Sequence, residues 1–539
     1  MSFWTGLPNQ LIINMKTMKS VISAIAMALL VVACTAPAQV DLKVPAPEDV
    51  VMYQVNPRNF APENSFNAVV SHLDSIKTMG ANVLWFMPIY EIGSLKSVNS
   101  PYSIRDYRSV NPEFGTVEDF KNLVAESHKR GMIVIIDWVA NHTSWDSQWI
   151  YDHPEWYTHD ENGEIIPPAG TGWNDVADLD FSKPDMCQEM IDAMKFWVEE
   201  VGVDGFRCDA ADFVPYEFWQ DCLQQLRAIE GKELLMLAEG ERKDHFEAGF
   251  DMNYAWGWLA ALRRVYNGNT FNRQPGQGRR AGGPVPVSSL FTADSLEYAG
   301  LPEGKVKLRF TTNHDECVKM SPVREFFSPE GSMAAFVAST FIHGGVLIYG
   351  SQEVGYPGKI NFFNYVEVDW NANPHMYKEY CDLMKVYNSE PALRKGSMVP
   401  YPDNNVLVFE RVYEGDKILV VINMRDTQQH IALPDAWKGR ACTNLVTGEA
   451  VNLPAGEELL RPWLNDHQTM KKLLSLIVLA LCCTSVSAVE IQRMDPPFWY
   501  AGMKNTELQV MFYGENIADA SFSLEKYDGV TLKEVCKVE

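Results

Sequence analysis

The sequence predicts an α/β protein, a (β/α)8 barrel of the TIM barrel type followed by a small antiparallel β-sandwich. Between residues 46 and 395, short apolar runs alternate with helix-like segments, which is the pattern of parallel βα units. Past residue 396 the pattern changes to alternating strands with Gly and Pro between them, which favours an antiparallel sheet over 396–465. These two observations carry the fold prediction.

The elements follow in order from the first apolar run, residues 50–55, which comes after a Pro-rich spacer. A helix is predicted at 67–79 and the second strand at 82–87. Further barrel strands are predicted at 132–136, 205–209, 234–237, 250–254, 306–310 and 345–349, with helices at 187–201 and 334–343. The segment 267–286 is rich in Gly, Pro and Arg and predicts a loop. In the C-terminal part, strands 405–412 and 417–424 are joined by a turn at 414–416.

Composition restricts the classes of partner. The 539 residues with 46% hydrophobic content suffice for a large core and a smaller domain. A formal net charge of -24 argues against nucleic acid and anionic membrane surfaces and is compatible with a neutral ligand. The 10 cysteines show no C-x-x-C pair or zinc-like spacing, so neither a metal site nor a disulfide framework is indicated.

Four of the predicted strands end in polar residues that can carry chemistry. Asp209 is the last residue of its predicted strand, and the other three strands are followed directly or closely by Asp137 to His142, by Glu239, and by Asn313 to Asp315. The carboxyl ends of all strands in a (β/α)8 barrel meet at one face, where the active sites of such proteins lie. We therefore expect these four groups to converge.

The stretch from Gly205 to Asp209 is the most informative. Side chains alternate along a strand, so Arg207 and Asp209 share one face while Phe206 and Cys208 point the other way. A permanent cation favours the ionised form of Asp209, which suits a nucleophile. The alternative is a structural Arg-Asp ion pair, and Cys208 is interpreted as a small buried hydrophobe.

With all four motifs in this order, residues 50–463 resemble the α-amylase family, glycoside hydrolase family 13. The resemblance implies that Asp209 is the nucleophile, Glu239 the general acid/base and Asp315 the carboxylate that stabilises the transition state. Glu239 follows an apolar run, and apolar surroundings favour a protonated acid. Glu241, two residues on, is a rival for the acid role.

The same resemblance implies a set of substrate contacts. Arg207 would orient the nucleophile, His142 and His314 would bind sugar hydroxyls, and Tyr102, in the segment 100–107, would stack on the sugar ring that is attacked. The short insertion at 143–190 corresponds to a protruding domain of the family, and its tryptophans are candidates for the lining of a glucan cleft: Trp145, Trp149, Trp156 and Trp173.

The implied function is hydrolysis of α-1,4-glucosidic bonds in starch, maltodextrin or related α-glucans with retention of configuration. That reaction needs two carboxyl groups about 5 Å apart, one ionised and one protonated. Two alternatives stay open: a transglycosylase that uses the same residues, and a non-catalytic glycan-binding lipoprotein.

No cofactor is required for this chemistry, but the resemblance raises the question of a structural Ca²⁺. Asn141, Asp178 and Asp180 offer oxygen atoms of the kind that Ca²⁺ prefers. The position where many α-amylases have a histidine ligand is Phe213, so we expect the calcium site to be missing.

Residues 1–33 predict an upstream extension and a signal peptide. Lys16 and Lys19 precede an apolar run at 21–33 that is too short to span a membrane. The run ends in a sequence that resembles a bacterial lipobox, so Cys34 is expected to become the lipid-modified first residue. The alternative is an ordinary cleaved signal. The protein is accordingly expected to be exported and anchored in the bacterial cell envelope.

The C-terminal end contains a second leader-like segment at 470–488, which opens with Met470-Lys471-Lys472 and has no obvious place inside a folded protein. Residues 489–539 resemble the beginning of the N-terminal β-sandwich of neopullulanase or cyclomaltodextrinase type enzymes. We interpret the arrangement as two neighbouring reading frames that have been joined. The alternative is a genuine tail with a membrane-associated helix.

Overall fold

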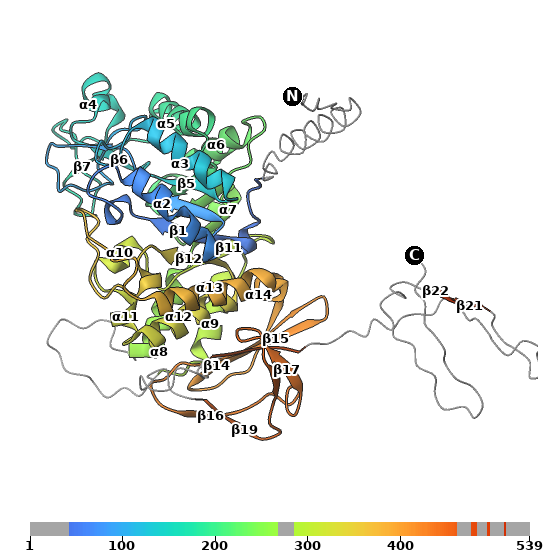
Figure 1. Ribbon diagram of the computed structural model, residues 1–539. Helices are drawn as coiled ribbons and strands as arrows, with labels where there is room; N and C mark the ends of the chain where they lie inside the picture. The colour runs from blue at the N-terminus through green and yellow to red at the C-terminus, as the bar shows by residue number, and fades with distance from the viewer. Residues whose placement is uncertain (1–41, 268–284, 461–475, 482–492, 496–510, 514–539) are drawn as a thin grey trace, which may run out of the picture.

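The computed structural model describes residues 42–267, 285–460, 476–481, 493–495 and 511–513. Its central feature is a closed barrel of eight parallel strands, with helices around it (Figure 1). The order of the strands around the barrel is β1-β12-β11-β10-β9-β8-β5-β2. The strands are β1 (Val51–Val55), β2 (Val83–Phe86), β5 (Ile133–Trp138), β8 (Gly205–Cys208), β9 (Leu235–Ala238), β10 (Met252–Tyr254), β11 (Val306–Arg309) and β12 (Gly345–Tyr349). The barrel confirms the predicted fold class. The predicted signal peptide with Cys34, and all but the ends of the loop at 267–286, lie outside the described residues.

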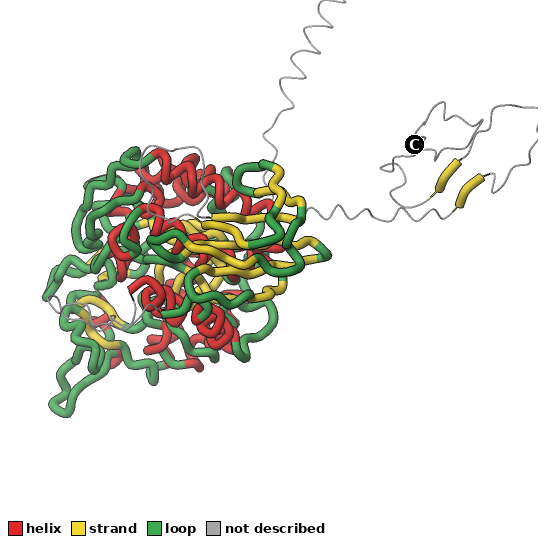
Figure 2. Tube along the Cα trace, turned by 90° about the horizontal axis from the view of Figure 1, so that it is seen from below, coloured by secondary structure: helices red, strands yellow, loops and turns green. Residues whose placement is uncertain are grey.

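Helices surround these strands, as the perpendicular view also shows (Figure 2). The longer ones are α2 (Ser65–Thr78), α3 (Val117–Lys129), α5 (Pro184–Phe196), α6 (Tyr216–Arg227), α8 (Trp256–Asn267), α9 (Ser289–Tyr298), α12 (Pro329–Ile342) and α13 (Pro374–Ser389). The shorter ones are α4 (Gln148–Asp152), α7 (Asp244–Ala248), α10 (His314–Cys317), α11 (Pro322–Glu325) and α14 (Pro391–Lys395). The predicted helix at 187–201 starts earlier, at Pro184, and its last turn is a π-helix, Trp197–Val201, that ends at Gly202 with φ 88°.

Strand alternation divides the apolar side chains into two layers. Side chains such as Trp85, Ile133, Ile135 and Leu237 form a buried cluster with other residues from the barrel strands. The intervening side chains, among them Phe206 and Cys208, belong to a second buried cluster that includes the helices. The outward orientation predicted for Phe206 and Cys208 is thus confirmed.

Two excursions leave the barrel at the carboxyl ends of its strands. After β2 the chain forms the hairpin β3 (Glu91–Ile92) and β4 (Ile104–Asp106), and after β5 it forms the hairpin β6 (His142–Ser144) and β7 (Val176–Asp178) with α4 between the two strands. The second excursion is the predicted insertion. Its first strand begins at His142, whose register partner is Asp178.

The C-terminal strands form antiparallel sheets, as predicted. They are β13 (Ser397–Pro400), β14 (Val406–Tyr413), β15 (Asp416–Asn423), β16 (Gln429–Ala432), β17 (Ala441–Asn444), β18 (Ala450–Asn452), β19 (Glu457–Leu460) and β20 (Leu476–Leu481). The turn between β14 and β15 has positive φ at Glu414 (50°) and Gly415 (96°), the backbone that a tight β-hairpin requires. Buried Arg411 donates to the carbonyl groups of Ile342 and Ala392, which fastens this part to the barrel helices α12 and α14.

The apolar run inside 470–488 has a place in this sheet that the sequence did not suggest. Leu476–Leu481 forms β20, which pairs with β15 on one side and β17 on the other. A short apolar run suits an inner strand as well as the core of a leader peptide, because length and hydropathy are similar in both. Farther on, β21 (Arg493–Asp495) pairs with β22 (Met511–Tyr513). Among the described residues, the structure contains no helix long and apolar enough to cross a membrane.

Candidate active site

The guanidinium of Arg207 is the centre of the site. On β8 it lies beside Asp137 of β5, its register partner, and its Nη1 donates to Asp137 Oδ1 at 2.7 Å and to Asp209 Oδ1 at 2.8 Å. Its Nη2 lies 2.9 Å from Glu239 Oε2, and its Nε donates to the Tyr254 hydroxyl at 3.1 Å. One cation therefore holds three carboxyl groups, and loss of any partner would leave buried charge that is costly to accommodate.

Exposure increases from the floor of the site towards its mouth. The side chains of Arg207 and Asp137 are 0% exposed, Asp209 is 12% and Glu239 19% exposed, and Asp315 reaches 39%. The buried groups are thus structural anchors, whereas the three carboxylates predicted as catalytic face the opening of the barrel. This gradient follows from their position at and beyond the strand ends.

The backbone after Asp209 and Glu239 takes unusual conformations that fix the two carboxylates. Ala210 has φ 43°, in the left-handed region, and its N–H donates to Glu239 Oε2 at 2.8 Å. Gly240 has φ 157°, and a Cβ there would approach Asp212 to 2.4 Å. Glu241 consequently does not share the Glu239 position: it accepts a hydrogen bond from Gly257 N at 3.2 Å on the exposed side.

A chain of hydrogen bonds connects the predicted histidine and tyrosine to Arg207. Gln54 Nε2 donates to His314 Nδ1 at 2.8 Å, so that His314 Nε2 carries the proton and lies 2.6 Å from the Tyr102 hydroxyl. The Tyr102 hydroxyl in turn donates to Asp137 Oδ2 at 3.1 Å. The Tyr102 and His314 rings are stacked, with their centroids 5.4 Å apart and an angle of 18° between their planes. His314 Nε2 also lies 3.4 Å from Asp315 Oδ2.

His142 approaches Tyr102 from the insertion. Its Nδ1 accepts from the Asn141 amide at 3.3 Å and its Nε2 donates to the Tyr102 carbonyl at 3.2 Å. Burial lowers the pKa of His142 to about 4, and burial together with Arg207 lowers the pKa of His314 to about 3. Both imidazoles are therefore neutral near pH 7. The structure brings together all seven predicted catalytic and substrate-binding residues.

One electrostatic expectation needs correction. Arg207 does favour ionisation of Asp209, as predicted, but burial raises the pKa of Asp209 more strongly, and the nearby Glu239 and Asp137 raise it further. Burial also raises the pKa of Asp137, to about 7. Burial outweighs the single guanidinium at both positions, so Asp209 and Asp137 retain protons to a higher pH than isolated carboxyl groups do.

The residues implied for calcium do lie together but do not form a suitable site. Asn141, Asp178, Asp180 and Phe213 line one hollow of about 380 Å³. Asp180 is already paired with Lys183 at 3.3 Å, and Phe213 contributes no oxygen. Within the described ranges, no group of three His, Cys, Asp or Glu side chains is arranged to hold a metal ion. Because a lysine already binds one of the two carboxylates, these side chains are a poor match for Ca²⁺, which takes six to eight oxygen ligands. Its absence remains a prediction.

The four tryptophans of the insertion take different positions. Trp173 lies edge-on to His142 at 5.5 Å and 5.6 Å from Phe213, which is 56% exposed. Trp145 is covered by the Lys96 ammonium at 3.3 Å, and Trp156 is buried. Trp149 lines a separate hollow together with residues of the β3–β4 hairpin. Trp173 is therefore the one of the four that contacts a predicted site residue.

Several site residues were not assigned a role from the sequence. Asp137 was recognised as a strand-end residue, but its position beside Arg207 depends on the pairing of β5 with β8. Its alternation with Ile133 and Ile135 on the inner face was the signal that placed it inside the barrel. Gln54, Trp85 and Tyr254 carry no such signal, because each comes from a strand without a polar motif.

Comparisons with known proteins agree with this geometry. Residues 54–162 and 169–253, which include Asp209 and Glu239, match the family described as alpha amylase, catalytic domain. Residues 398–468 match the maltogenic amylase C-terminal domain. Residues 493–539 match the cyclomaltodextrinase N-terminal domain, in agreement with the resemblance of the tail.

Curated relatives cover the chain to different extents. Alpha-amylase MalA of Haloarcula japonica is 27% identical over 425 residues, which are 75% of this chain and 59% of that protein. Trehalose-6-phosphate hydrolase of Bacillus subtilis is 34% identical over 200 residues, 30% of this chain and 35% of that protein. The chain thus spans 59% and 35% of the lengths of these two relatives.

Among solved structures, an α-amylase from Lactobacillus plantarum superimposes with a TM-score of 0.68 at 26% identity, over 80% of this chain and 99% of that one. The family matches and the relatives indicate the same family as the barrel with its carboxylate cluster. The barrel of this chain is thus similar to the α-amylase family of glycoside hydrolases, whose catalytic-domain model matches residues 54–162 and 169–253.

Proposed function

We propose that this protein is a retaining glycoside hydrolase that cleaves α-1,4-glucosidic bonds in starch, maltodextrin or related α-glucans. The observation that carries the proposal is the contact of one guanidinium, that of Arg207, with both Asp209 and Glu239. Retention requires two carboxyl groups about 5 Å apart. Carboxylates held by the two nitrogens of a single guanidinium lie near each other, which is compatible with this short spacing and supports the proposal.

In the first step Asp209 attacks the anomeric carbon while Glu239 protonates the departing glycosidic oxygen. Because Asp209 Oδ1 is held by Arg207, Oδ2 is the attacking atom. Because Glu239 Oε2 accepts from Ala210 N–H and faces Arg207, the transferable proton belongs on Oε1. The step forms the Asp209 ester bond to the sugar, breaks the glycosidic bond and leaves Glu239 ionised.

In the second step Glu239 takes a proton from water, and the resulting hydroxyl oxygen attacks the same carbon from the side opposite Asp209. The ester bond breaks, Asp209 leaves as a carboxylate, and Glu239 is protonated again. Two inversions give net retention. A sugar hydroxyl in place of water would give transglycosylation, the alternative that uses the same residues.

The remaining residues bind the sugar. Neutral His142 and His314 are assigned to sugar hydroxyl groups, and for such a contact their Nε2–H groups must exchange their present partners on Tyr102. Partly exposed Asp315 stabilises positive charge that develops on the ring in the transition state. The Tyr102 ring provides a flat apolar surface for the attacked unit. Exposed Phe213, beside Trp173, provides another for a neighbouring unit.

The test compares the parent with D209N on soluble starch and maltoheptaose by reducing-sugar release. We expect D209N to lose several orders of magnitude in turnover, because an amide cannot form the ester. Asp244→Asn, which alters a surface ion pair with Arg242, is the matched control and should retain activity. Proton NMR of the first products should detect the α-anomer. Initial release of the β-anomer would refute retention, and full activity of D209N would refute the assigned nucleophile.

We also propose that the protein is exported and anchored through a lipid on Cys34, on the basis of the leader-like segment before it. Intact-mass measurement of the membrane fraction should find a chain that starts at Cys34 and carries acyl groups. A mature chain that starts elsewhere without lipid would contradict this.

A further inference from the structure

We propose that the hollow beside Trp149 is a second, non-catalytic saccharide site, which takes one or two units of a neutral α-glucan chain. The hollow lies between the β3–β4 hairpin and α4 and has a volume of about 220 Å³. Pockets that enclose whole drug-sized ligands are larger, about 300–1,000 Å³, so this one suits a short part of a longer chain. The identity of the saccharide rests on the proposed function.

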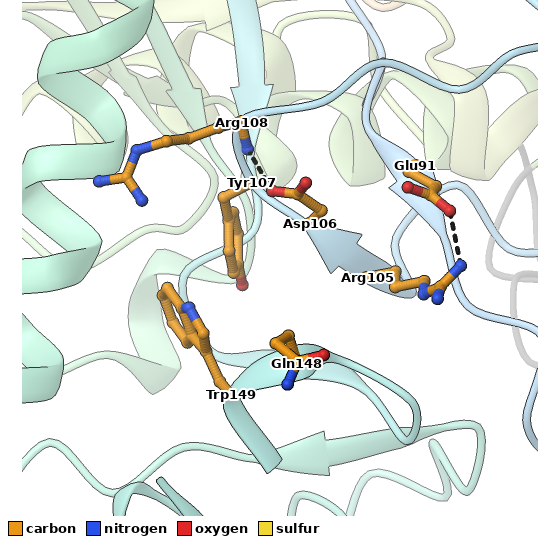
Figure 3. Close-up of a pocket in the computed structure, with 7 residues that line it drawn as sticks. All are labelled: Glu91, Arg105, Asp106, Tyr107, Arg108, Gln148 and Trp149. Carbon is orange, nitrogen blue, oxygen red and sulfur yellow. Dashed lines mark hydrogen bonds and ion pairs between the residues drawn. The ribbon is translucent and has the colours of Figure 1, made fainter. Parts of the chain in front are cut away.

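One wall of the hollow is aromatic and rigid. Figure 3 shows the rings of Trp149 and Tyr107 side by side, and their centroids are 5.1 Å apart with an interplanar angle of 32°. Trp156 supports Trp149 edge-on at 5.4 Å, and the Tyr107 hydroxyl donates to the Val139 carbonyl at 2.7 Å. The half-buried indole of Trp149 is therefore fixed before any ligand arrives. A fixed, partly exposed indole gives the apolar face of a pyranose a contact surface at small entropic cost.

The opposite side of the hollow is polar and balanced in charge. Across the hollow from the rings, Arg105 Nη1 donates to Glu91 Oε1 at 2.7 Å (Figure 3). Arg108 is paired with Glu189, and its backbone N–H donates to Asp106 Oδ1 at 2.8 Å. Both cations are thus neutralised by carboxylates, which disfavours an anionic ligand. Guanidinium donors beside carboxylate acceptors are suited to the hydroxyl pairs of a neutral sugar.

The hollow is separate from the catalytic site. None of the seven residues that line it belongs to the Arg207 cluster or its substrate-binding neighbours. Tyr107 separates the two, because its hydroxyl also donates to the His142 carbonyl at 2.9 Å. A glucan long enough to occupy both places would bind bivalently, and its apparent affinity would exceed that of a short oligosaccharide.

The test uses Trp149→Ala in two assays. In the first, calorimetric titration of full-length D209N with maltoheptaose should give two binding sites, and D209N with Trp149→Ala should give one. In the second, the ratio of kcat/KM on soluble starch to that on maltotriose should fall about tenfold in Trp149→Ala, because only the long substrate reaches both places. Tyr151→Ala is the matched control, since Tyr151 is a 64% exposed aromatic residue on the same helix that does not line the hollow. It should keep two sites and the parental ratio.

A second variant guards against misfolding of Trp149→Ala. Arg105 is 49% exposed, and loss of its surface ion pair with Glu91 costs little stability, so Arg105→Ala should fold and yet weaken the second binding event. One binding site in D209N, or two sites in both Trp149→Ala and Arg105→Ala, would overturn the inference. Failure of the proposed function can be distinguished from failure of this inference. In that case the parent would hydrolyse neither starch nor maltotriose, but the titration would still give the number of binding sites.

Discussion

Asp137 offers the sharpest test of the electrostatics of the site. Its Oδ1 and the Oδ1 of Asp209 contact the same nitrogen of Arg207 at 2.7 Å and 2.8 Å, so the two oxygens are at most about 5.5 Å apart. At an effective dielectric constant of about 20, two unit charges at that distance interact by about 3 kcal/mol, or about 2 pKa units. The charge of Asp137 raises the pKa of Asp209, so removing it should lower that pKa.

The D137N variant makes this change with the same side-chain shape. Burial raises the pKa of Asp137 itself to about 7, so Asp137 carries only part of its charge in acid. We therefore expect its replacement to lower the pKa of Asp209 by about 1 unit, less than the full value of about 2 units. The nucleophile must be ionised in the free enzyme, so the acid limb of the kcat/KM profile should move to lower pH. The assay is maltoheptaose hydrolysis between about pH 4 and pH 9.

The variant also has a structural cost that must be measured separately. Asp137 Oδ2 accepts from the Tyr102 hydroxyl at 3.1 Å and from Trp85 Nε1 at 3.3 Å, and an amide nitrogen in that place cannot accept. About 1–3 kcal/mol of stability should be lost, and circular dichroism must show that the protein stays folded during the assay. Asp74→Asn, an exposed change in an ion pair with Arg130, is the control. An acid limb that stays in place or moves to higher pH in D137N would refute the reasoning.

Three further predictions concern stability and the choice of acid. In the folded state, burial lowers the pKa of His142 from 6.5 to about 4. The unfolded chain takes up a proton at this position below about pH 6.5, and that proton favours unfolding. The free energy of unfolding should therefore fall by about 3 kcal/mol as the pH decreases from above 6.5 to 4. Denaturant titrations at pH 7 and pH 4 should show that the free energy of unfolding falls by about 3 kcal/mol less in H142N than in the parent. An equal fall in the two proteins would contradict the prediction. A chelator should leave Tm unchanged, because the Asp180 carboxylate that calcium would need already binds Lys183. A drop of several degrees in Tm would show that a metal is bound. E241Q should retain activity, because the Glu241 side chain accepts a hydrogen bond from Gly257 N–H and lies on the exposed side. E239Q should lose most of its turnover. The opposite result would assign the general acid to Glu241.

Much of the site was predictable because strand geometry is local. Alternation placed Arg207 and Asp209 on one face, and the rule that barrel strands end at a common face brought Glu239, His142 and Asp315 towards them. These inferences need only the period of the strand and the order of the motifs. They do not depend on how far apart in sequence the groups lie.

Other features depended on packing between distant segments. The contact of Arg207 with Asp137 needs the pairing of β5 with β8, and the Gln54, His314 and Tyr102 chain needs closure of the barrel through β1. The separate positions of Trp173 and Trp149 follow from the path of the insertion and have no signature in the sequence.

The sequence by itself thus determined the architecture, the family resemblance and the candidate carboxylates, because each follows from a repeating local pattern or a short motif. Only the tertiary structure decided the ionisation of the cluster, since burial outweighs the neighbouring Arg207 in raising the pKa of Asp209. It also decided that Glu241 accepts a hydrogen bond from Gly257 N–H, whereas Glu239 contacts Arg207, and that a hollow forms beside Trp149. Burial, electrostatic coupling and the shape of a cavity are properties of many residues packed together, and no single stretch of sequence encodes them.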